Sequence, residues 1–546
     1  MKTKKDTLLK LSGSMTISST VNYTSGIPYR LPPFSWTFSW YPVLTFKGIT
    51  IPTRIILGKQ DSYFHQPFNQ IGISPRYKWI TLHLGYRNLH FSPFTLAGHT
   101  FLGTGLELNP GKWKIALMYG RLRKAIGEDP LLPYQIQATY KRLGYGGNIG
   151  YGNKDNFIAF SFFRARDDTA SLENNTFNTN NQLTPSDNLV AGIRSKQQVG
   201  KKNSAMKWVW ETDWAASAYN SDYRAQSIAS GKLGLWKPFT GLFQPTHSMR
   251  LATAGQIALT LKQKDYATIL RYRRIDPDYR SMGAYYFQTD VESITLEPSW
   301  KSCKKKLSIQ STLGFERNNL AQQRNATTKR TVGSLNLSFN PTPKYALDVQ
   351  IANYGCTQQT GRNPLNDTIR MVQANRNICI VNRYLSASET KTQSLTFMLN
   401  YQLVSDLNAF TSPVNNSQVF NLQLAYDKVL IPAGLTMNTS IQHTTLTNNS
   451  GRNTISGITG SMTKNLKANK LSYHKAVSIF FTSFHPNGTV VSNEQRSKML
   501  TLNAGIQDKI NRHHQWNIDV NGLFNWAPAN QSFSEITGRL AYTYHF

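Results

Sequence analysis

Large apolar residues recur at every second position along most of this 546-residue chain. The segment 206–214 shows the pattern clearly, because Trp208, Trp210 and Trp214 alternate with polar or charged residues. Side chains two positions apart lie on the same face of a β-strand, so this spacing predicts a strand with one apolar and one polar face. The same alternation recurs in the segments 78–87, 266–273, 335–339, 345–351, 395–403, 420–426, 500–506 and 516–526. The chain is therefore predicted to be all-β.

The two faces of these strands differ more strongly than those of an ordinary soluble sheet. In the segment 206–214 the tryptophans lie on one face, and Lys207, Glu211 and Asp213 lie on the other. One such strand also fits a soluble sandwich, but a long series favours lipid on one side and water on the other. The mean hydropathy of −0.41 agrees with this, since only alternate residues of a barrel strand meet lipid. No run of 18 apolar residues is present, so no transmembrane helix is predicted.

The connections between the predicted strands alternate between short and long. Tight turns such as 109–112 and 153–156 contrast with long connections such as 276–288. This is the pattern of short periplasmic turns and longer extracellular loops. We therefore predict a single transmembrane antiparallel β-barrel over residues 14–546. We expect about 24 strands, within a range of roughly 20–26, because bacterial barrels have even strand numbers.

A barrel of this size is expected to hold something in its lumen. The segments 59–76 and 219–247 are candidate lumen-filling or extracellular loops. Residues 1–13 are predicted to be an N-terminal tail. The tail starts with lysines, but no apolar run follows them, so it shows no convincing signal peptide.

The last segment, 538–546, carries Leu540, Tyr542, Tyr544 and Phe546 on one face and ends on an aromatic residue. This ending resembles the closing strand of bacterial outer-membrane β-barrels, where it serves as an assembly signal. The resemblance implies that these four residues close the barrel and that the barrel assembly machinery is a partner.

The formal net charge is +32. Nucleic acid is not a predicted partner, because the basic residues are dispersed among strand-like segments and form no basic helix or familiar motif. Outer-membrane lipid, lipopolysaccharide phosphate and an anion-favouring lumen fit this distribution better. A plug or a periplasmic partner protein is a further candidate.

Five basic residues are predicted, from the alternation, to face the lumen. Arg271 and Arg273 alternate with Tyr272 toward the outer end of their strand. Inward cations raise the local anion concentration and set pore selectivity. The alternative is that these charges pair with acidic residues, such as Glu211 and Asp213, or with a plug. The full set is Arg87, Arg164, Lys207, Arg271 and Arg273.

The sequence contains no complete catalytic, cofactor-binding or metal-binding motif. The segment 144–149 begins like a dinucleotide fingerprint, but no glycine and no helix complete it. The three cysteines lack zinc-ligand spacing and form no disulfide framework. We therefore predict no cofactor, no metal and no enzymatic activity.

Several segments resemble a Bacteroidetes-type family of large outer-membrane barrels whose function is unassigned. They are Arg30–Trp36, Gln66–Gln70, Ser74–Arg87, Thr95–Gly103 and Arg274–Tyr286. The resemblance covers nearly the whole chain and implies a multi-pass protein of the cell outer membrane. It carries over no functional residue.

Two functions fit these predictions. The first is a conduit for solutes or polymers. The second is a plugged barrel that acts as a scaffold in a larger secretion or assembly complex. An outer-membrane protease or phospholipase is a third, weaker reading, because no catalytic triad stands out in the sequence.

Overall fold

The structure is a computed structural model, and strands dominate it. A single turn of 3₁₀ helix, Thr169–Ser171, follows one strand. Among the described residues, no helix is long and apolar enough to cross a membrane. The structure describes residues 9–59, 69–127, 138–172, 183–200, 205–228, 241–284, 288–302, 304, 306–324, 326–360, 372–408, 415–466, 470–487, 494–528 and 531–546.

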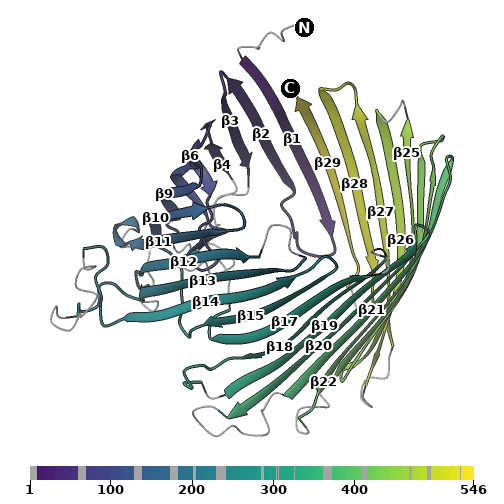
Figure 1. Ribbon diagram of the computed structural model, residues 1–546. Coiled ribbons are helices and arrows are strands. Elements are labelled where there is room, and N and C mark those ends of the chain that lie inside the picture. Colours follow the sequence, from purple (N-terminus) through teal and green to yellow (C-terminus); the bar gives the residue numbers. More distant parts are fainter. Residues whose placement is uncertain are drawn as a thin grey trace. The chain divides into compact units, whose positions relative to one another are not determined.

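Strands that follow one another in sequence pair side by side in one antiparallel sheet (Figure 1). The first strand, β1 (Leu9–Ser25), also pairs with the last, β29 (Phe533–His545). A sheet whose first and last strands pair has no free edge, which defines a closed barrel. Within the described residues the sheet has 27 strands. Because β4 and β5 share one place between β3 and β6, it has 26 strand positions. The predicted all-β antiparallel barrel is confirmed.

The chain divides into two compact units. Unit 1 comprises Met1–Ser14, Phe38–Lys262 and Leu270–Ser293. Its strands are most of β2 (Phe34–Phe46), β3 (Ile49–Gly58), β4 (Gln70–Ile73), β5 (Arg76–Tyr77), β6 (Ile80–Asn88), β7 (Leu96–Ala97), β8 (Thr100–Leu108), β9 (Trp113–Arg123), β10 (Lys141–Gly152), β11 (Phe157–Asp168), β12 (Asp187–Val199), β13 (Lys207–Asn220), β14 (Met249–Lys262), most of β15 (Tyr266–Ile275) and β16 (Gly283–Ala284).

Unit 2 comprises Met15–Thr37, Gln263–Ile269 and Ile294–Phe546. Its strands are most of β1, most of β17 (Val291–Ser302), β18 (Leu307–Arg317), β19 (Ala326–Thr342), β20 (Tyr345–Thr360), β21 (Val372–Ala387), β22 (Lys391–Asp406), β23 (Ser417–Leu430), β24 (Leu435–Asn448), β25 (Gly451–Leu466), β26 (Leu471–Pro486), β27 (Gln495–Lys509), β28 (His514–Trp526) and β29.

Most strands of unit 2 are longer than a bilayer requires. Strand β19 has 17 residues and β25 has 16. A tilted transmembrane strand needs only about 9–11 residues to cross the hydrocarbon layer. The ends of these strands therefore extend into water in a membrane-embedded protein.

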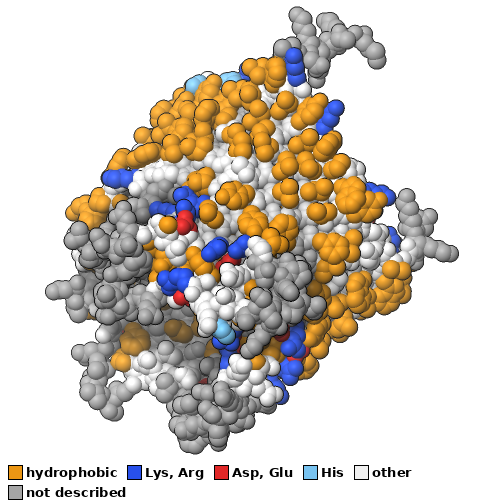
Figure 2. Space-filling model, turned by 90° about the vertical axis from the view of Figure 1, so that its left-hand side faces the viewer, with side chains coloured by type: hydrophobic (Ala, Val, Ile, Leu, Met, Phe, Trp, Pro, Cys, Tyr) orange, Lys and Arg blue, Asp and Glu red, His pale blue; other side chains and the backbone are white. Residues whose placement is uncertain are grey.

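Each unit has one face on which large apolar side chains are exposed, which we call the apolar face. In unit 1, Tyr119 is 58% exposed and Phe160 is 57% exposed. In unit 2, Ile441 of β24 is 56% exposed and Phe481 of β26 is 52% exposed. Figure 2 shows hydrophobic side chains gathered over broad areas, with small groups of basic and acidic side chains between them. Such contiguous apolar surface fits lipid contact.

The opposite face of unit 1 is covered by two loops, 89–99 and 276–284, which we call the inner loops. Alternate residues of the strands beneath them are buried, such as Phe163 of β11 and Val190 of β12. We call the face of the sheet beneath the inner loops the loop-covered face. The apolar core of unit 1 therefore lies between its sheet and the inner loops.

Some predicted segment boundaries differ from the structure. Strand β1 already begins at Leu9, inside the predicted tail 1–13. Residues 70–73 and 76–77 form β4 and β5, so this part of the segment 59–76 is largely strand rather than loop. Residues 60–68 and 229–240 lie outside the described residues, as do residues 1–8. The tight turn at Lys47 and Gly48 has positive φ at both residues, as a two-residue hairpin turn of type I′ requires.

Candidate functional site on the loop-covered face of unit 1

The two inner loops bind each other. Strand β7 in the first loop pairs in parallel with β16 in the second. The hydroxyl of Tyr279 donates to the carbonyl oxygen of Phe94 at 2.8 Å. The hydroxyl of Ser281 donates to the carbonyl oxygen of Thr95. Tyr279 has no exposed surface. These contacts therefore hold the two inner loops against each other.

Asn188 of β12 fixes the inner loops to the sheet. This side chain is fully buried. Its Oδ1 accepts from the backbone N–H of Met282 at 2.9 Å, and its Nδ2 donates to Ser217 Oγ at 2.9 Å. Ser217 in turn donates to the carbonyl oxygen of Arg280. An amide is suited to this place because it satisfies a donor and an acceptor at once.

Two apolar clusters fill the space between the inner loops and the strands. The first contains Leu89, Phe91, Leu96, Phe101, Met118, Leu122, Phe163, Ala165 and Met282. The second contains Phe94, Val190, Ala215, Ala252, Ala254, Ile275, Tyr279 and Val291. Each cluster takes residues from both a loop and the sheet. Apolar burial therefore holds the inner loops against the sheet, and the hydrogen bonds set their position.

A charged pocket of about 210 Å³ lies beside the first inner loop. Arg194 of β12 lies opposite Asp213 of β13, which lies opposite Gln256 of β14. The next row contains Lys196 and Glu211, whose Nζ and Oε1 atoms are 2.6 Å apart. The charged residues that line the pocket are Lys154, Arg194, Lys196, Arg271, Glu211 and Asp213. The lining of the pocket thus contains four basic side chains and two carboxylates.

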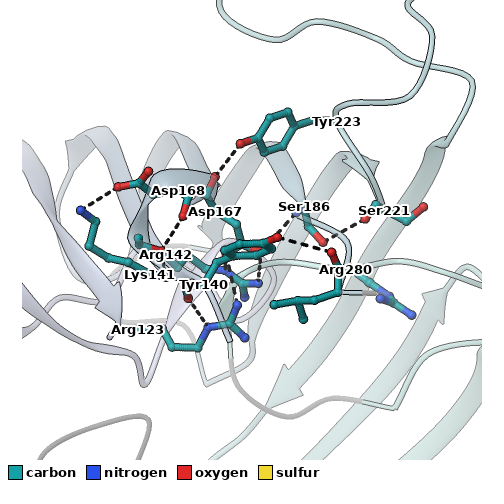
Figure 3. A network of polar contacts seen from close by, with 12 residues as sticks. Arg123, Tyr140, Lys141, Arg142, Asp167, Asp168, Ser186, Ser221, Tyr223 and Arg280 are labelled. Carbon is teal, nitrogen blue, oxygen red and sulfur yellow. Dashed lines mark hydrogen bonds and ion pairs between the residues drawn. The ribbon is translucent and has the colours of Figure 1, made fainter. Parts of the chain in front are cut away.

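A second charged cluster lies near the loop ends of β9, β10 and β11 (Figure 3). Arg142 of β10 donates to both carboxylate oxygens of Asp167, at 2.8 and 3.0 Å, and Arg123 of β9 donates to it at 3.2 Å. The backbone N–H of Ser186 also donates to this carboxylate at 3.2 Å. The side chain of Asp167 is only 2% exposed. One buried carboxylate therefore balances two guanidinium groups.

His99, at the end of the first inner loop, is buried. Burial and the charges of Arg142 and Arg123 together lower the pKa of His99 to about 4, against the opposite effect of a hydrogen bond to the backbone of Thr100. The folded state thus resists protonating this ring, whereas the unfolded chain protonates it near pH 6.5.

The sign of the resulting pH dependence follows from this lowered pKa. Stability is fully present above about pH 6.5 and is lost as the pH falls toward 4, by about 3 kcal/mol. Denaturant unfolding in detergent micelles between pH 8 and pH 4 measures this loss. Because His99→Gln lacks the titrating ring, we expect this variant to lose about 3 kcal/mol less stability over this pH range than the wild-type protein. If the stability of the two proteins changes identically with pH, His99 does not cause the pH dependence.

Four of the five predicted lumen cations lie on the loop-covered face. Arg271 lines the charged pocket. Arg273 is two residues further along the same strand, β15. Lys207 lies opposite Lys262 at the turn end of β13. Arg87 of β6 lies opposite the buried Phe101 and donates to the carbonyl oxygen of Pro52 at 3.3 Å. The structure does not bring these four together in one cluster.

Arg164 lies on the apolar face instead. It shares that face of β11 with Phe160 and Phe162, which are exposed, while Phe163 is buried beneath the inner loops. Its guanidinium donates to both carboxylate oxygens of Asp187, at 3.1 and 2.8 Å. The placement differs from the prediction because adjacent phenylalanines make the alternation of this strand ambiguous.

The C-terminal residues lie together as the alternation predicts. Leu540 pairs across with Ile518 of β28, and Tyr542 lies opposite Trp516, with ring centroids 4.6 Å apart. The rings of Tyr544 and Phe546 follow, with centroids 5.9 Å apart. Their role as a barrel-closing signal remains a prediction.

Sequence reasoning missed the residues that fix the inner loops. The available signal was the concentration of apolar side chains, such as Phe91, Phe94 and Leu96, just after the predicted strand segment 78–87. In the part of the chain that the structure describes, no group of three or more His, Cys, Asp or Glu side chains could hold a metal ion.

No family model and no curated protein matches this sequence. Among solved structures, the chain is similar to the ferric enterobactin receptor PfeA from Pseudomonas aeruginosa (TM-score 0.41, 10% identity, 98% of this chain and 80% of that one). It is also similar to the P pilus usher PapC translocation pore (0.33, 9%, 98% and 99%). A third structure is OpdK from Pseudomonas aeruginosa with vanillate (0.30, 10%, 66% and 93%). Because these TM-scores are below 0.5, we infer function from this chain's own residues.

Proposed function

We propose that this protein is a multi-pass barrel of the cell outer membrane that conducts polar solutes and favours anions. The observation that carries the proposal is the charged pocket on the loop-covered face, with its four basic side chains and two carboxylates. The apolar faces of both units support the membrane setting, because water is a poor solvent for so many exposed aliphatic and aromatic side chains. We infer no catalytic role.

The pocket supports anion preference by simple electrostatics. Lys196 is paired with Glu211, and the other charged side chains that line the pocket are Lys154, Arg194, Arg271 and the carboxylate of Asp213. Charges beside a low-dielectric wall act over a longer distance than charges in open water. An anion passing this face is therefore attracted, and a cation meets a barrier.

Reversal potentials across a planar bilayer under a KCl gradient test this function. We expect the wild-type protein to prefer chloride, and we expect Arg194→Gln combined with Arg271→Gln to shift the preference toward potassium. Lys428→Gln is the matched control, because Lys428 lies on the apolar face of β23 with Tyr426. Potassium preference in the wild-type protein, or an equal shift in the control, would refute the proposal.

A plugged scaffold is the second candidate, and the hydrogen bonds between the inner loops favour it. Tyr279, Ser281 and Asn188 hold the loops closely to the sheet. If the inner loops and further material close the lumen, the purified protein will show no stable conductance. It will instead retain stoichiometric partners after mild solubilisation. A stable conductance without partners would exclude this candidate.

A further inference from the structure

The apolar face of β9–β12 changes in chemical character along the strands. Register pairs Ile115, Ile149, Phe160 and Ile193 in one row near the short turns. Further toward the loop ends, Tyr119, Tyr145 and Arg164 form another row. The last full row contains Arg121, Leu143 and Arg166. The face thus passes from aliphatic to tyrosine to arginine, as at the boundary between lipid tails and headgroups.

A pocket of about 460 Å³ lies where the tyrosine row meets the arginine row. Tyr119, Leu143 and Tyr145 supply apolar surface from the strands, and Tyr223 approaches from a loop. The hydroxyl of Tyr223 donates to the carbonyl oxygen of Asp167 at 3.0 Å, which fixes its ring (Figure 3). The pocket is therefore built from positioned side chains and opens beside the exposed apolar rows.

Arg166 lines this pocket, and Arg121 lies across Leu143 from it in the arginine row; both keep their charge available. The guanidinium of Arg166 lies over the ring of Tyr223, 4.0 Å from its centroid, and Arg166 is exposed. Arg121 donates to the hydroxyl of Tyr86 at 3.0 Å. Both contacts are to phenol groups, so neither cation is neutralised by a carboxylate within the described residues.

The other charges around this pocket are matched in pairs. Arg164 is paired with Asp187 through two hydrogen bonds. Lys141 lies 2.7 Å from Asp168. The excess charge of the site is therefore carried by the two arginines bound only to phenols, and it is positive.

We propose that this pocket binds a phosphorylated lipid of the surrounding membrane leaflet. The acyl chains lie along the aliphatic row and Tyr119, and a phosphate group receives hydrogen bonds from Arg166 and Arg121. Guanidinium groups suit this role because their N–H donors match phosphate oxygens in pairs. Lipid is favoured over free phosphate because the pocket is continuous with the exposed apolar rows. The site lies on the opposite face of the sheet from the charged pocket, so it does not depend on the conduit function.

Native mass spectrometry of the detergent-solubilised protein tests the site, with bis-phosphorylated lipid A and its fully dephosphorylated form as probes. We expect the phosphorylated probe to bind at least about tenfold more tightly, which corresponds to one lost charge-assisted hydrogen bond. We expect Arg166→Gln with Arg121→Gln to remove this preference and Arg166→Lys to keep part of it. The control is Arg512→Gln, which removes a charge from the short turn between β27 and β28.

Each remaining outcome overturns the proposal. Equal binding of the two probes would show that phosphate is not recognised. Unchanged binding by the double variant, or equal loss in Arg512→Gln, would show that these arginines are not the site. Displacement of the lipid by the same concentration of inorganic phosphate would show a site for free phosphate instead. Far-UV circular dichroism of each variant verifies that it retains the β-sheet fold.

Discussion

Replacing Asp167 with asparagine is expected to destabilise the protein by about 3–5 kcal/mol, because it removes the negative partner of a buried ion cluster. The side chain of Asp167 is 2% exposed and accepts hydrogen bonds from both Arg123 and Arg142. Asparagine keeps the size of the side chain but leaves two guanidinium groups without a counter-charge. Denaturant unfolding in detergent micelles measures the loss of free energy.

The neighbouring aspartate is the matched control. Asp168 pairs with Lys141 at 2.7 Å, but its side chain is 31% exposed and that of Lys141 is 36% exposed. An exposed ion pair of this kind contributes roughly 0–1 kcal/mol, so Asp168→Asn should change stability little. If both substitutions cost the same, the two-arginine cluster does not stabilise the fold in the way its geometry indicates.

Replacing Tyr279 with alanine is expected to release the inner loops. The ring of Tyr279 is fully buried, and such truncations of large aromatic side chains cost about 3–5 kcal/mol. Because the lost free energy comes from the contact between the inner loops and the sheet, the fraction of molecules with detached inner loops should increase by roughly 100-fold or more. We expect faster proteolysis within 276–284 and a higher single-channel conductance.

Tyr279→Phe separates the packing of the ring from its hydrogen bond. This variant keeps the ring against Phe94 and loses the hydrogen bond to the carbonyl oxygen of Phe94, which costs about 1 kcal/mol. We expect its proteolysis rate and conductance to stay near those of the wild-type protein. If Tyr279→Ala leaves proteolysis and conductance unchanged, the inner loops do not restrict access to this face.

The barrel could be predicted from the sequence because each strand carries its own evidence. In β28, Trp516, Ile518 and Val520 alternate with polar residues, and the structure exposes all three on one face. The alternation is a local property that no distant partner changes. The number of strands could be predicted only approximately, since short elements such as β4 and β5 carry too few residues to show a period.

The inner loops could not be predicted in the same way. Tyr279 and Phe94 are 185 positions apart, and no periodic pattern links them. The different surroundings of Asp167 and Asp168 could not be predicted either, because the two residues are adjacent and identical in sequence but lie on opposite faces of β11.

The central claim is that the sheet closes through the pairing of its first and last strands. The hydroxyl oxygens of Thr16 in β1 and Thr543 in β29 are 3.0 Å apart. Thr459 and Ser478, on the neighbouring strands β25 and β26, have the same separation of 3.0 Å and provide the positive control. Each pair is changed to cysteine in a protein whose three native cysteines are replaced by serine.

Disulfide formation after mild oxidation is then measured by non-reducing gel electrophoresis of the membrane-embedded protein. The closed barrel predicts that Thr16→Cys with Thr543→Cys cross-links as completely as Thr459→Cys with Ser478→Cys. Cross-linking of the control pair alone would contradict closure between β1 and β29.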